Sequence, residues 1–398
     1  MPHAHRALAK VLALKDFEAL ARKRLPAALY GYVSGACEDG HSLRENEQSF
    51  ADYALTTRVL VDISAREQSV EIFGHRYSAP FGIAPMGVAS MTAYRGDIVL
   101  AESAARANVP AIMSGWSLIP MEEVARAAPG TWFQAYLSRR QDQMDALIDR
   151  VARAGFGTLV ITVDTPSPAN RENNVRVGFS SPLRPTARLA WQGLTHPRWL
   201  LGVLARTFVH HGMPHFENWH GERGAPIFSK TLDVDIAQRG HLTWGHIAQI
   251  RDRWKGRLVL KGILNPLDAR KAADHGVDGI IVSNHGGRQL DGAVPPMRAL
   301  PAVLEQFRGG PVMLDSGARR GTDVVKAIAL GAAAVFIGRP FNYAASVAGA
   351  AGVAHGIALL REEISKNMAM MGMTTLAQLD SSCLVPLRPG LSATAHRP

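Results

Sequence analysis

Cysteine is scarce in this sequence, which has only Cys37 and Cys383 among its 398 residues. The two lie far apart in the chain, and neither belongs to a group of cysteines and histidines of the kind that binds zinc. We therefore expect no disulfide framework and no metal site. Nothing in this cysteine usage indicates an oxidising compartment.

Long apolar runs are missing as well. No stretch of apolar residues reaches the roughly 18 residues that a membrane-spanning helix requires. The basic N-terminal segment MPHAHRALAKVLALKDF is interrupted by Lys10 and Lys15 and is followed by no cleavage signature, so no secretory signal is expected. These absences predict a cytoplasmic protein that is not integral to a membrane.

Signatures of nucleic-acid binding are also absent, although the formal net charge is +10. Lysine and arginine are scattered singly, and no zinc-finger, basic-zipper or RNA-platform motif accompanies them. We therefore expect no nucleic-acid partner. An anionic substrate, an anionic cofactor or an anionic membrane surface would each suit the positive charge.

What the sequence does contain is a repeated alternation of strand-like and helix-like segments. Eight short runs rich in β-branched residues read PFGIAPMG, PAIMSGW, TWFQAYL, TLVITVD, RLVLKG, GIIVSNHGG, PVMLDSG and AVFIGRP. Helix-like segments between them include residues 96–107, 142–154, 266–275 and 322–330. Repeated βα units predict parallel strands, and eight of them close most simply into a (β/α)₈ TIM barrel of the α/β class.

A doubly wound nucleotide-binding domain is the rival fold. It should carry G-x-G-x-x-G between a strand and a helix, whereas the nearest candidate, GFGTLV, precedes its strand. We therefore expect one domain over residues 1–398, with N-terminal helices in 1–75, a barrel in 76–370 and a C-terminal tail in 371–398. A long loop insertion at 165–229 follows the fourth strand, and loops of this length are commonly functional lids.

Five segments carry a resemblance to a known family: ITVDTP, LVLKG, SNHGGRQLD, LDSGARRGTDV and FIGRP. Together they resemble the FMN-dependent 2-hydroxy-acid oxidase and dehydrogenase family, which includes glycolate oxidase, flavin-type L-lactate dehydrogenase and (S)-mandelate dehydrogenase. The resemblance runs from about Asp16 to about Leu379. It implies an FMN-binding barrel that oxidises an (S)-2-hydroxy acid of the lactate, glycolate or mandelate type to the 2-oxo acid. It also implies a homo-oligomer, commonly a tetramer, and oxygen or a quinone as electron acceptor.

The carboxyl ends of the predicted strands carry polar residues, where barrel enzymes place their active sites. His285 is the candidate base, because an imidazole with a pKa near ~6.5 accepts a proton near neutrality. Asp164 is the candidate carboxylate that stabilises the imidazolium. Arg288 can grip a substrate carboxylate through two parallel hydrogen bonds. The alternative for His285 is a hydrogen-bonded structural histidine, but the surrounding motif favours catalysis.

The resemblance implies further contacts with the substrate. Tyr32 would bind the carboxylate together with Arg288, Tyr136 would hydrogen-bond the substrate during catalysis, and Arg171 would lie nearby as a second cation. Each has a plainer alternative, since Tyr32 could be an amphipathic-helix residue, Tyr136 a strand aromatic and Arg171 a solvated loop charge. Within the motifs YGYVSGA and TVDTPSPANR, we favour the functional interpretation.

Cofactor-binding residues are expected at the same strand ends. A buried Lys261 would need an anion, and its ammonium would stabilise negative charge that develops on a reduced flavin. The resemblance implies ring contacts from Ser114, Gln134 and Thr162, and ribityl contacts from Asp315. A phosphate would bind near the last two strands, unless the basic residues there belong to a solvated loop. The predicted cofactor-binding set is Pro85, Met86, Gly87, Ser114, Gln134, Thr162, Lys261, Ser283, Asp315, Gly317, Arg319, Gly338 and Arg339.

Three residues resemble different members of the family, so the substrate's side chain and the electron acceptor are not decided by the sequence. Met86 and Gly87 stand where members resembling glycolate oxidase tend to have Thr and Ala, and Gly87 resembles mandelate dehydrogenase. Trp116 resembles glycolate oxidase and would narrow the pocket for the substrate's side chain. Alternatives are a non-catalytic flavin-binding sensor and an FMN barrel that acts on another anion, such as isopentenyl-diphosphate isomerase. The motif SNHGGRQ argues against the isomerase, and the combination of base, counter-ion and carboxylate clamp argues against the sensor.

The insertion is basic, with no Asp or Glu from Asn173 to Phe216. Its segment HPRWLLGVLARTFVHH predicts an amphipathic helix that begins near Pro197. The predicted apolar face contains Trp199, Leu200, Leu201, Val203, Leu204 and Phe208, opposite a polar row of Arg198, Gly202, Arg206 and His210. One interpretation is packing on the barrel or on another subunit. The other is peripheral contact through residues 180–215 with the anionic inner face of a membrane, where a quinone would accept the electrons.

Overall fold

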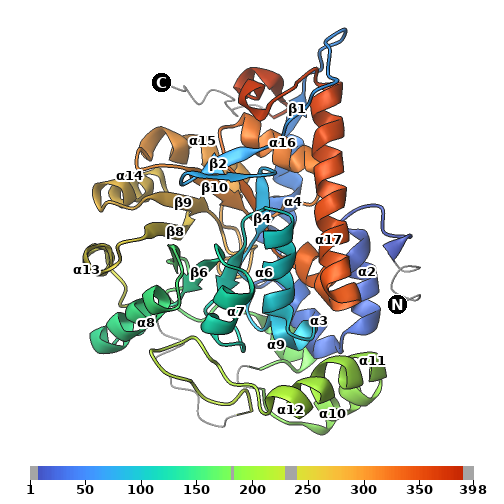
Figure 1. The fold of residues 1–398 in the computed structure, drawn as a ribbon, viewed down its shortest axis with the longest axis vertical. Helices are drawn as coiled ribbons and strands as arrows, with labels where there is room; N and C mark the ends of the chain where they lie inside the picture. Colours follow the sequence, from blue (N-terminus) through green and yellow to red (C-terminus); the bar gives the residue numbers. More distant parts are fainter. Residues whose placement is uncertain (1–7, 181–182, 229–239, 389–398) are drawn as a thin grey trace.

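Eight parallel strands form the centre of the computed structural model, which describes residues 8–180, 183–228 and 240–388 (Figure 1). The strands are β4 (Phe81–Ile83), β5 (Ile112–Ser114), β6 (Trp132–Ala135), β7 (Thr158–Thr162), β8 (Arg257–Ile263), β9 (Gly279–Val282), β10 (Val312–Asp315) and β11 (Val335–Ile337). Their order is β4-β11-β10-β9-β8-β7-β6-β5, and an isolated parallel bridge between Ile83 and Ala111 brings the two ends of the sheet together. The predicted (β/α)₈ barrel is confirmed, and each strand-like run forms one strand.

Alternate side chains of the strands fill the inside of the barrel. They form an apolar cluster separate from the layer between strands and helices: Ile112, Trp132, Val160, Val259, Ile281, Met313 and Phe336. An antiparallel hairpin of β2 (Val70–Ile72) and β3 (His75–Tyr77) adds to this cluster. Phe73 in its turn lies 5.6 Å from Trp132 between ring centroids, and Trp132 begins its strand. The hairpin therefore closes the amino-terminal end of the barrel.

Helices surround the strands (Figure 1). They are α6 (Gly96–Arg106), α7 (Met121–Ala127), α8 (Gln141–Arg153), α13 (Trp244–Arg253), α14 (Pro266–Asp274), α15 (Pro296–Gln306), α16 (Gly321–Ala329) and α17 (Arg339–Met370). The helices predicted from the sequence are confirmed by α6, α8, α14 and α16. Local signals explain where α14 begins, because the Asn265 side chain accepts a hydrogen bond from the Leu267 N–H and Pro266 occupies the first turn.

One described helix, α17, is long and apolar enough to cross a membrane by length and composition. The sequence analysis expected no such segment, because polar residues interrupt this run. The helix packs against α6, α16 and α2 (Asp16–Arg24), and 56% of its most apolar stretch is buried. It is also kinked at Ala348 and Gly349, which have non-helical backbone angles. Packing within the fold therefore accounts for its apolar character.

The N-terminal residues lie beside the barrel. They form α2, α3 (Ala27–Ser34), α4 (His41–Gln48) and η1 (Ser49–Asp52), while α5 (Ala89–Thr92) follows the first barrel strand. Strand β1 (Tyr53–Leu55) pairs antiparallel with β12 (Leu384–Pro386), which follows η4 (Leu376–Gln378) and η5 (Ser381–Cys383). The sequence analysis expected the helices but not these strands, because three residues are too few to show a period. Residues 1–7 and 389–398 of the predicted terminal segments lie outside the described residues.

The predicted insertion follows the fourth barrel strand, β7. It contains α9 (Glu172–Val177), α10 (Ala187–Leu194) and one longer helix composed of α11 (Pro197–Trp199), the π-helical η2 (Leu200–Ala205) and α12 (Arg206–His211). These helices lie at the edge of the molecule, next to α3 (Figure 1). The Trp199 indole N–H donates to the Met91 carbonyl at 2.7 Å and fixes the long helix to α5. Residues 181, 182 and 229 of the insertion lie outside the described residues.

The long helix is amphipathic, and its predicted apolar face is mostly covered by the fold, since Leu200, Leu204 and Phe208 are partly buried. Trp199 and Val203 are buried, whereas Leu201 is 68% exposed and Val209, which had not been assigned to the face, is 79% exposed. The π-helical turns of η2 space side chains differently from a regular α-helix, and Leu201, which lies in η2, is the predicted face residue left exposed to solvent.

Candidate active site

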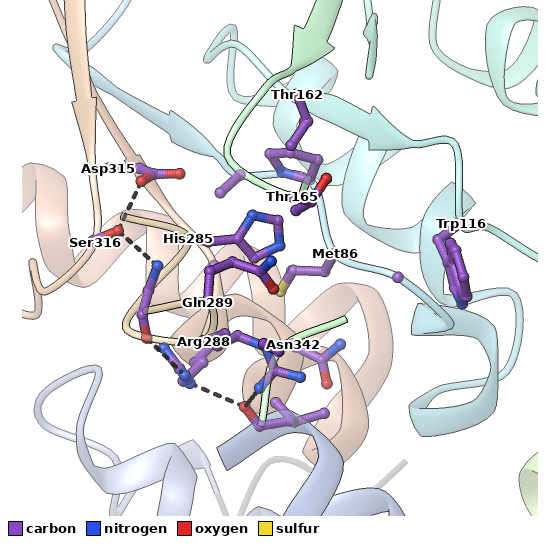
Figure 2. Close-up of a pocket in the computed structure, with 18 of the residues that line it drawn as sticks. Met86, Trp116, Thr162, Thr165, His285, Arg288, Gln289, Asp315, Ser316 and Asn342 are labelled. Atoms are coloured by element: carbon purple, nitrogen blue, oxygen red, sulfur yellow. Dashed lines mark hydrogen bonds between the residues drawn. The ribbon is translucent and has the colours of Figure 1, made fainter. Parts of the chain in front are cut away.

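A cavity of about 390 Å³ opens at the carboxyl ends of the barrel strands. It brings together side chains from both halves of the chain (Figure 2). The predicted site residues that line it are Tyr32, Pro85, Met86, Gly87, Trp116, Gln134, Tyr136, Thr162, Arg171, Lys261, His285, Arg288, Asp315, Gly317, Arg319, Gly338 and Arg339.

Three predicted residues lie behind the cavity wall instead. Asp164 contacts His285, the Ser114 hydroxyl donates to Gln134 Oε1 at 3.1 Å, and Ser283 accepts a hydrogen bond from Lys261 at 2.8 Å. Each of them therefore touches a cavity-lining residue. We infer that these three residues orient His285, Gln134 and Lys261.

The turn that carries His285 has an unusual backbone. His285, Gly286 and Gly287 all have positive φ angles, of 58°, 68° and 70°. A Cβ on Gly287 would lie 2.5 Å from the backbone nitrogen of Leu43, so only glycine fits there. The Ser283 hydroxyl accepts from the His285 N–H at 3.0 Å. The glycines in SNHGG thus let the chain turn sharply and direct the imidazole into the cavity.

His285 and Asp164 form a buried pair, with 2.9 Å between Nδ1 and Oδ1. Burial lowers the pKa of His285, Asp164 opposes this change, and Lys261 and Arg171 add to it. Burial raises the pKa of Asp164, but His285 and Lys261 outweigh burial, so the net pKa is lowered. The pair therefore consists of a neutral imidazole and an ionised carboxylate. With Nδ1–H donating to Asp164, the Nε2 atom is left as a proton acceptor.

Lys261 lies at the end of β8, and its side chain is almost fully buried. Its ammonium contacts Asp315 at 3.0 Å and donates to the Ser283 hydroxyl. Burial lowers the pKa of Lys261, but Asp315 and Asp164 reverse the effect and raise it overall. Lys261 is consequently a protonated cation on the cavity wall, held by one carboxylate.

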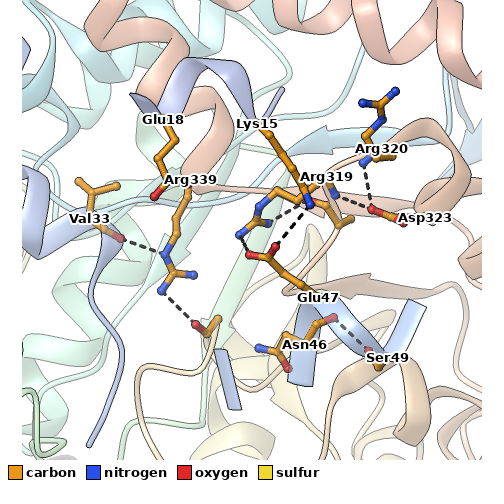
Figure 3. A network of polar contacts seen from close by, with 12 residues as sticks. Lys15, Glu18, Val33, Asn46, Glu47, Ser49, Arg319, Arg320, Asp323 and Arg339 are labelled. Carbon is orange, nitrogen blue, oxygen red and sulfur yellow. Dashed lines mark hydrogen bonds and ion pairs between the residues drawn. The ribbon is translucent and has the colours of Figure 1, made fainter. Parts of the chain in front are cut away.

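A second group of cations gathers around the ends of β10 and β11. Arg339 donates from Nε to the Val33 carbonyl at 2.9 Å and from one terminal nitrogen to the carbonyls of Gly35 and Gly286 (Figure 3). Arg319 pairs with Glu47 at 2.9 Å. Burial, reinforced by Arg319, lowers the pKa of Arg339 to about 10. A bound anion would relieve this crowding of positive charge.

Arg288 and Arg171 form another cationic side of the cavity. The Arg288 guanidinium donates to the Gly35 carbonyl at 2.8 Å and lies 5.1 Å from the ring centre of Tyr32. Burial, together with Arg171 and Arg339, lowers the pKa of Arg288 to about 9. Arg171 donates to the Arg288 carbonyl at 3.0 Å and to the Gln289 side chain. Both arginines line the same cavity and add positive charge to the same side of it.

The cavity also fits a large polar cofactor. Two buried side-chain atoms on its wall, Gln134 Nε2 and Asn342 Oδ1, have no hydrogen-bond partner among the described residues. A donor and an acceptor without partners are costly inside a protein unless a ligand satisfies them. Lys261 at one part of the wall, and Arg319 and Arg339 at another, suit a molecule with an electron-accepting ring and a phosphate.

Several residues that support the site were not found from the sequence. Asn46 and Asn284 exchange two amide hydrogen bonds, at 2.7 and 2.6 Å, and the Asn284 oxygen also accepts from the Gly287 N–H. Asp291 accepts from the His41 and Ser42 N–H groups at the start of α4. Helix α4 thereby holds the turn of His285. An asparagine in a polar helix gives no sequence signal of a partner more than 200 positions away.

The insertion also contributes to the cavity wall. Asn174, Phe179 and Ser180 line it, and the Phe179 ring stacks on Tyr32 with 4.3 Å between centroids. The remaining lining residues missed by the sequence analysis include Gln289, Ser316 and Asn342. Among the residues that the structure describes, no group of three or more His, Cys, Asp or Glu side chains could hold a metal ion.

Comparison with known proteins identifies the family. The family model described as FMN-dependent dehydrogenase matches residues 21–386. The chain is 39% identical over 375 residues to L-lactate dehydrogenase of Alcaligenes faecalis, covering 93% of this chain and 97% of the relative. It is also 39% identical over 391 residues to L-lactate dehydrogenase of Ectopseudomonas mendocina, covering 95% and 100%.

Solved structures agree with this assignment. The monotopic membrane protein (S)-mandelate dehydrogenase is 33% identical with a TM-score of 0.85, covering 95% of this chain and 100% of that one. Mandelate oxidase is 31% identical with a TM-score of 0.76, covering 92% and 96%. Since the family model spans nearly the whole chain and these relatives align along their full length, the chain belongs to the FMN-dependent dehydrogenase family.

Proposed function

We propose that this protein oxidises an (S)-2-hydroxy acid to the corresponding 2-oxo acid. The observation that carries the proposal is one cavity lined by His285, which is paired with Asp164, and by Arg288 and Lys261. A base, a carboxylate clamp and a cation for a reduced ring are the groups this oxidation needs. The names of the relatives, L-lactate dehydrogenase and (S)-mandelate dehydrogenase, support the same substrate class.

His285 acts as the base in this proposal. Its Nε2 atom accepts the proton that the substrate loses, and the resulting imidazolium is stabilised by Asp164 at 2.9 Å. FMN, when bound, supplies the acceptor for the two electrons and the second hydrogen of the substrate. The pKa of Asp164 is lowered by His285 and Lys261, so Asp164 remains ionised and keeps its hydrogen bond with Nδ1 of His285.

The substrate carboxylate binds Arg288 and Tyr32, with Arg171 as the second cation and Tyr136 as a hydrogen-bonding group. All four line the cavity, and Arg171 is fastened to the backbone of Arg288. A planar guanidinium that grips a carboxylate through two bonds fixes the substrate in orientation as well as in place. The α-carbon is thereby directed toward His285.

FMN would be held by the remaining wall of the cavity. Lys261 would stabilise the reduced ring, Asp315 would accept from ribityl hydroxyls, and the phosphate would lie among the basic residues. The ring would contact Gln134 and Thr162, with Pro85, Met86 and Gly87 nearby, and the phosphate would contact Gly317, Arg319, Gly338 and Arg339. Ser114 and Ser283 would hold Gln134 and Lys261 in place from behind the cavity wall. The buried atoms Gln134 Nε2 and Asn342 Oδ1, which have no hydrogen-bond partner among the described residues, support a polar cofactor here.

The outer side of the insertion supports peripheral contact with an anionic membrane through residues 180–215. Large apolar side chains are exposed on α10 and on the helix from 197 to 211, namely Trp191, Leu194, Leu201 and Val209. Arginines lie beside them, and such a combination binds anionic lipid surfaces. One structural relative, (S)-mandelate dehydrogenase, is a monotopic membrane protein. We propose the cytoplasmic face of the membrane, with a quinone as electron acceptor, and a homotetramer as the family resemblance implies.

Anaerobic reduction of the bound flavin tests the proposed function. The purified yellow protein is mixed with matched (S)- and (R)-2-hydroxy acids, and flavin absorbance is followed. Lactate, glycolate and mandelate cover the three side-chain types. We expect bleaching by the (S) compounds and by glycolate, with no bleaching by the (R) compounds. Flavin that stays oxidised with every member of the panel would refute the proposed function.

A further inference from the structure

A cluster of aromatic rings lies behind the Trp116 side of the cavity. The ring centroid of Trp116 is 4.1 Å from that of Trp219 and 5.5 Å from that of Phe216, and these two rings are 5.6 Å from each other. Trp116 lines the cavity, whereas Phe216 and Trp219 do not, and both are buried. The insertion therefore supplies a second aromatic layer behind a cavity-lining indole.

Gly87 and Tyr136 also lie close to Trp116. A Cβ on Gly87 would lie 3.1 Å from both Cβ and Cδ1 of Trp116 and 3.0 Å from the Tyr32 hydroxyl. Tyr136 meets the indole edge-on with 5.9 Å between centroids. Trp116 therefore faces the cavity on one side and contacts neighbouring side chains on the others, and this close packing restricts rotation of the indole.

Hydrogen bonds fasten the segment of Phe216 and Trp219 to the loop that carries Trp116. The Asn218 side chain accepts from the Met121 N–H at 2.8 Å and donates to the carbonyls of Ile119 and Ser117 at 2.8 and 3.3 Å. Asn218 is almost fully buried. Arg150 adds a bond to the Glu217 carbonyl at 2.7 Å. The two rings therefore move only together with the loop after β5.

Trp116 lies where the side chain of a substrate would end. In Figure 2 it lies on the other side of His285 from Asp315, and it is well separated from Arg288, which would hold the carboxylate. A carboxylate at Arg288 and an α-carbon near His285 leave the third substituent to point toward Met86, Tyr136 and Trp116. The position of the indole consequently limits the size of that substituent.

We propose that Phe216 and Trp219 determine the substrate's size, by holding Trp116 across the side-chain end of the pocket so that small aliphatic 2-hydroxy acids are preferred to aryl ones. This inference rests on the proposed oxidation of 2-hydroxy acids. Phe216 and Trp219 are positioning residues, since they act through Trp116 without touching the cavity. Replacing either ring with a smaller side chain leaves a space into which the indole can turn, and the pocket then admits a phenyl group.

The test is the ratio of kcat/KM for (S)-mandelate to that for (S)-lactate. We expect the ratio to rise by about 10- to 100-fold in Trp219→Leu, the range in which hydrophobic pockets discriminate by size, and by less in Phe216→Leu. The conservative change Trp219→Phe should keep the ratio near that of the unchanged protein. Flavin absorbance per protein is recorded for each variant, so that only FMN-loaded enzyme is compared.

A matched control is Phe156→Leu. Phe156 is also a buried ring and lies 5.3 Å from Phe133 between centroids, but it stands before β7 at the opposite end of the barrel. Its replacement should reduce stability without changing the ratio. The pH below which the rate of flavin reduction falls should be the same in all variants, because His285 and Asp164 are unchanged.

Two results would overturn the proposal. One is an unchanged protein that already turns over mandelate better than lactate. The other is a ratio that stays within about twofold of the unchanged protein in both Trp219→Leu and Phe216→Leu. If one of these variants does not fold, the other still decides. Failure of the proposed function is a separate result, because the unchanged protein would then oxidise none of the 2-hydroxy acids.

Discussion

The cavity contains charged side chains that are buried and paired, whereas those on the outer side of the insertion are exposed. In the cavity, Lys261 contacts Asp315 and His285 contacts Asp164, and all four side chains are buried or nearly so. On the insertion, arginines and large apolar side chains are exposed together, and no carboxylate occurs from Asn173 to Phe216. A buried charge needs its partner, whereas an exposed one is solvated. Substitutions should therefore affect chemistry in the first region and surface binding in the second.

The largest effect is expected for His285→Asn. Without the base, the rate of flavin reduction by an (S)-2-hydroxy acid should fall by about 10² to 10⁴. FMN should remain bound, because the basic residues around Arg319 and Arg339 are unchanged. Stopped-flow absorbance under anaerobic conditions measures the rate. The control His275→Asn changes a partly exposed histidine that does not line the cavity and should leave the rate unchanged. Near-normal reduction in His285→Asn would place the base elsewhere.

Arg288→Lys should have the next largest effect. An ammonium cannot reproduce the two parallel bonds of a guanidinium. The loss of a charge-assisted hydrogen bond corresponds to about 10- to 100-fold weaker substrate binding. The dependence of the reduction rate on substrate concentration gives this affinity. Arg270→Lys, an exposed arginine that contacts Gln306, is the control. Unchanged affinity in Arg288→Lys would remove this residue from the carboxylate site.

The pH dependence should show how the His285–Asp164 pair works. Burial keeps the pKa of His285 below its ordinary value of 6.5, so the neutral base persists as pH falls to that value. The acid limb of the reduction rate should therefore lie below 6.5. The unfolded chain binds this proton more readily than the folded one, so this contribution to stability is lost as pH falls through the same range.

Asp164→Asn sharpens this expectation. Asp164 raises the pKa of His285 against burial, so its removal should move the acid limb to still lower pH. The rate on the plateau should also fall, because the imidazolium loses its carboxylate. Rate profiles of both proteins over the same pH range provide the comparison. An acid limb above 6.5 in the unchanged protein would contradict the environment described here.

The two regions also differ in how much of them could be predicted from the sequence. The barrel strands were predicted completely, because buried β-branched runs between helical segments have a clear pattern. The residues at the strand ends follow from that fold, so His285, Lys261 and Arg339 were placed in one cavity. The pairing of Asn46 with Asn284 was not predictable, because a contact between distant polar residues leaves no pattern in one sequence.

Less of the insertion than of the barrel could be predicted from the sequence. Its helix was predicted at the correct place and most of its apolar face is covered as predicted, but Leu201, in the π-helical η2, is exposed. The rings of Phe216 and Trp219 follow in an irregular segment with no period, so their contact with Trp116 could not be inferred. Hydrophobic pattern identifies which residues are apolar, and the backbone geometry decides which neighbour they meet.

Substitutions of exposed apolar residues on the insertion should have the smallest effect on flavin reduction. They should instead change membrane binding, which separates the two regions most clearly. Leu201→Asp and Val209→Asp place carboxylates on a surface that we propose to contact anionic lipid. Both changes should reduce co-sedimentation with anionic vesicles at low salt, through lost apolar burial and charge repulsion. The rate of flavin reduction in solution should stay the same, because neither residue lines the cavity.

The matched control is Leu267→Asp, since Leu267 is 61% exposed but lies on α14, outside the insertion. It adds the same charge to the protein, so any difference in pelleting comes from where the charge stands. Neutral vesicles and high salt should each weaken binding of the unchanged protein, because arginine attraction to anionic lipid is screened. If the unchanged protein does not pellet with anionic vesicles at low salt, the exposed side chains of the insertion meet another protein surface, and the barrel and insertion differ in packing alone.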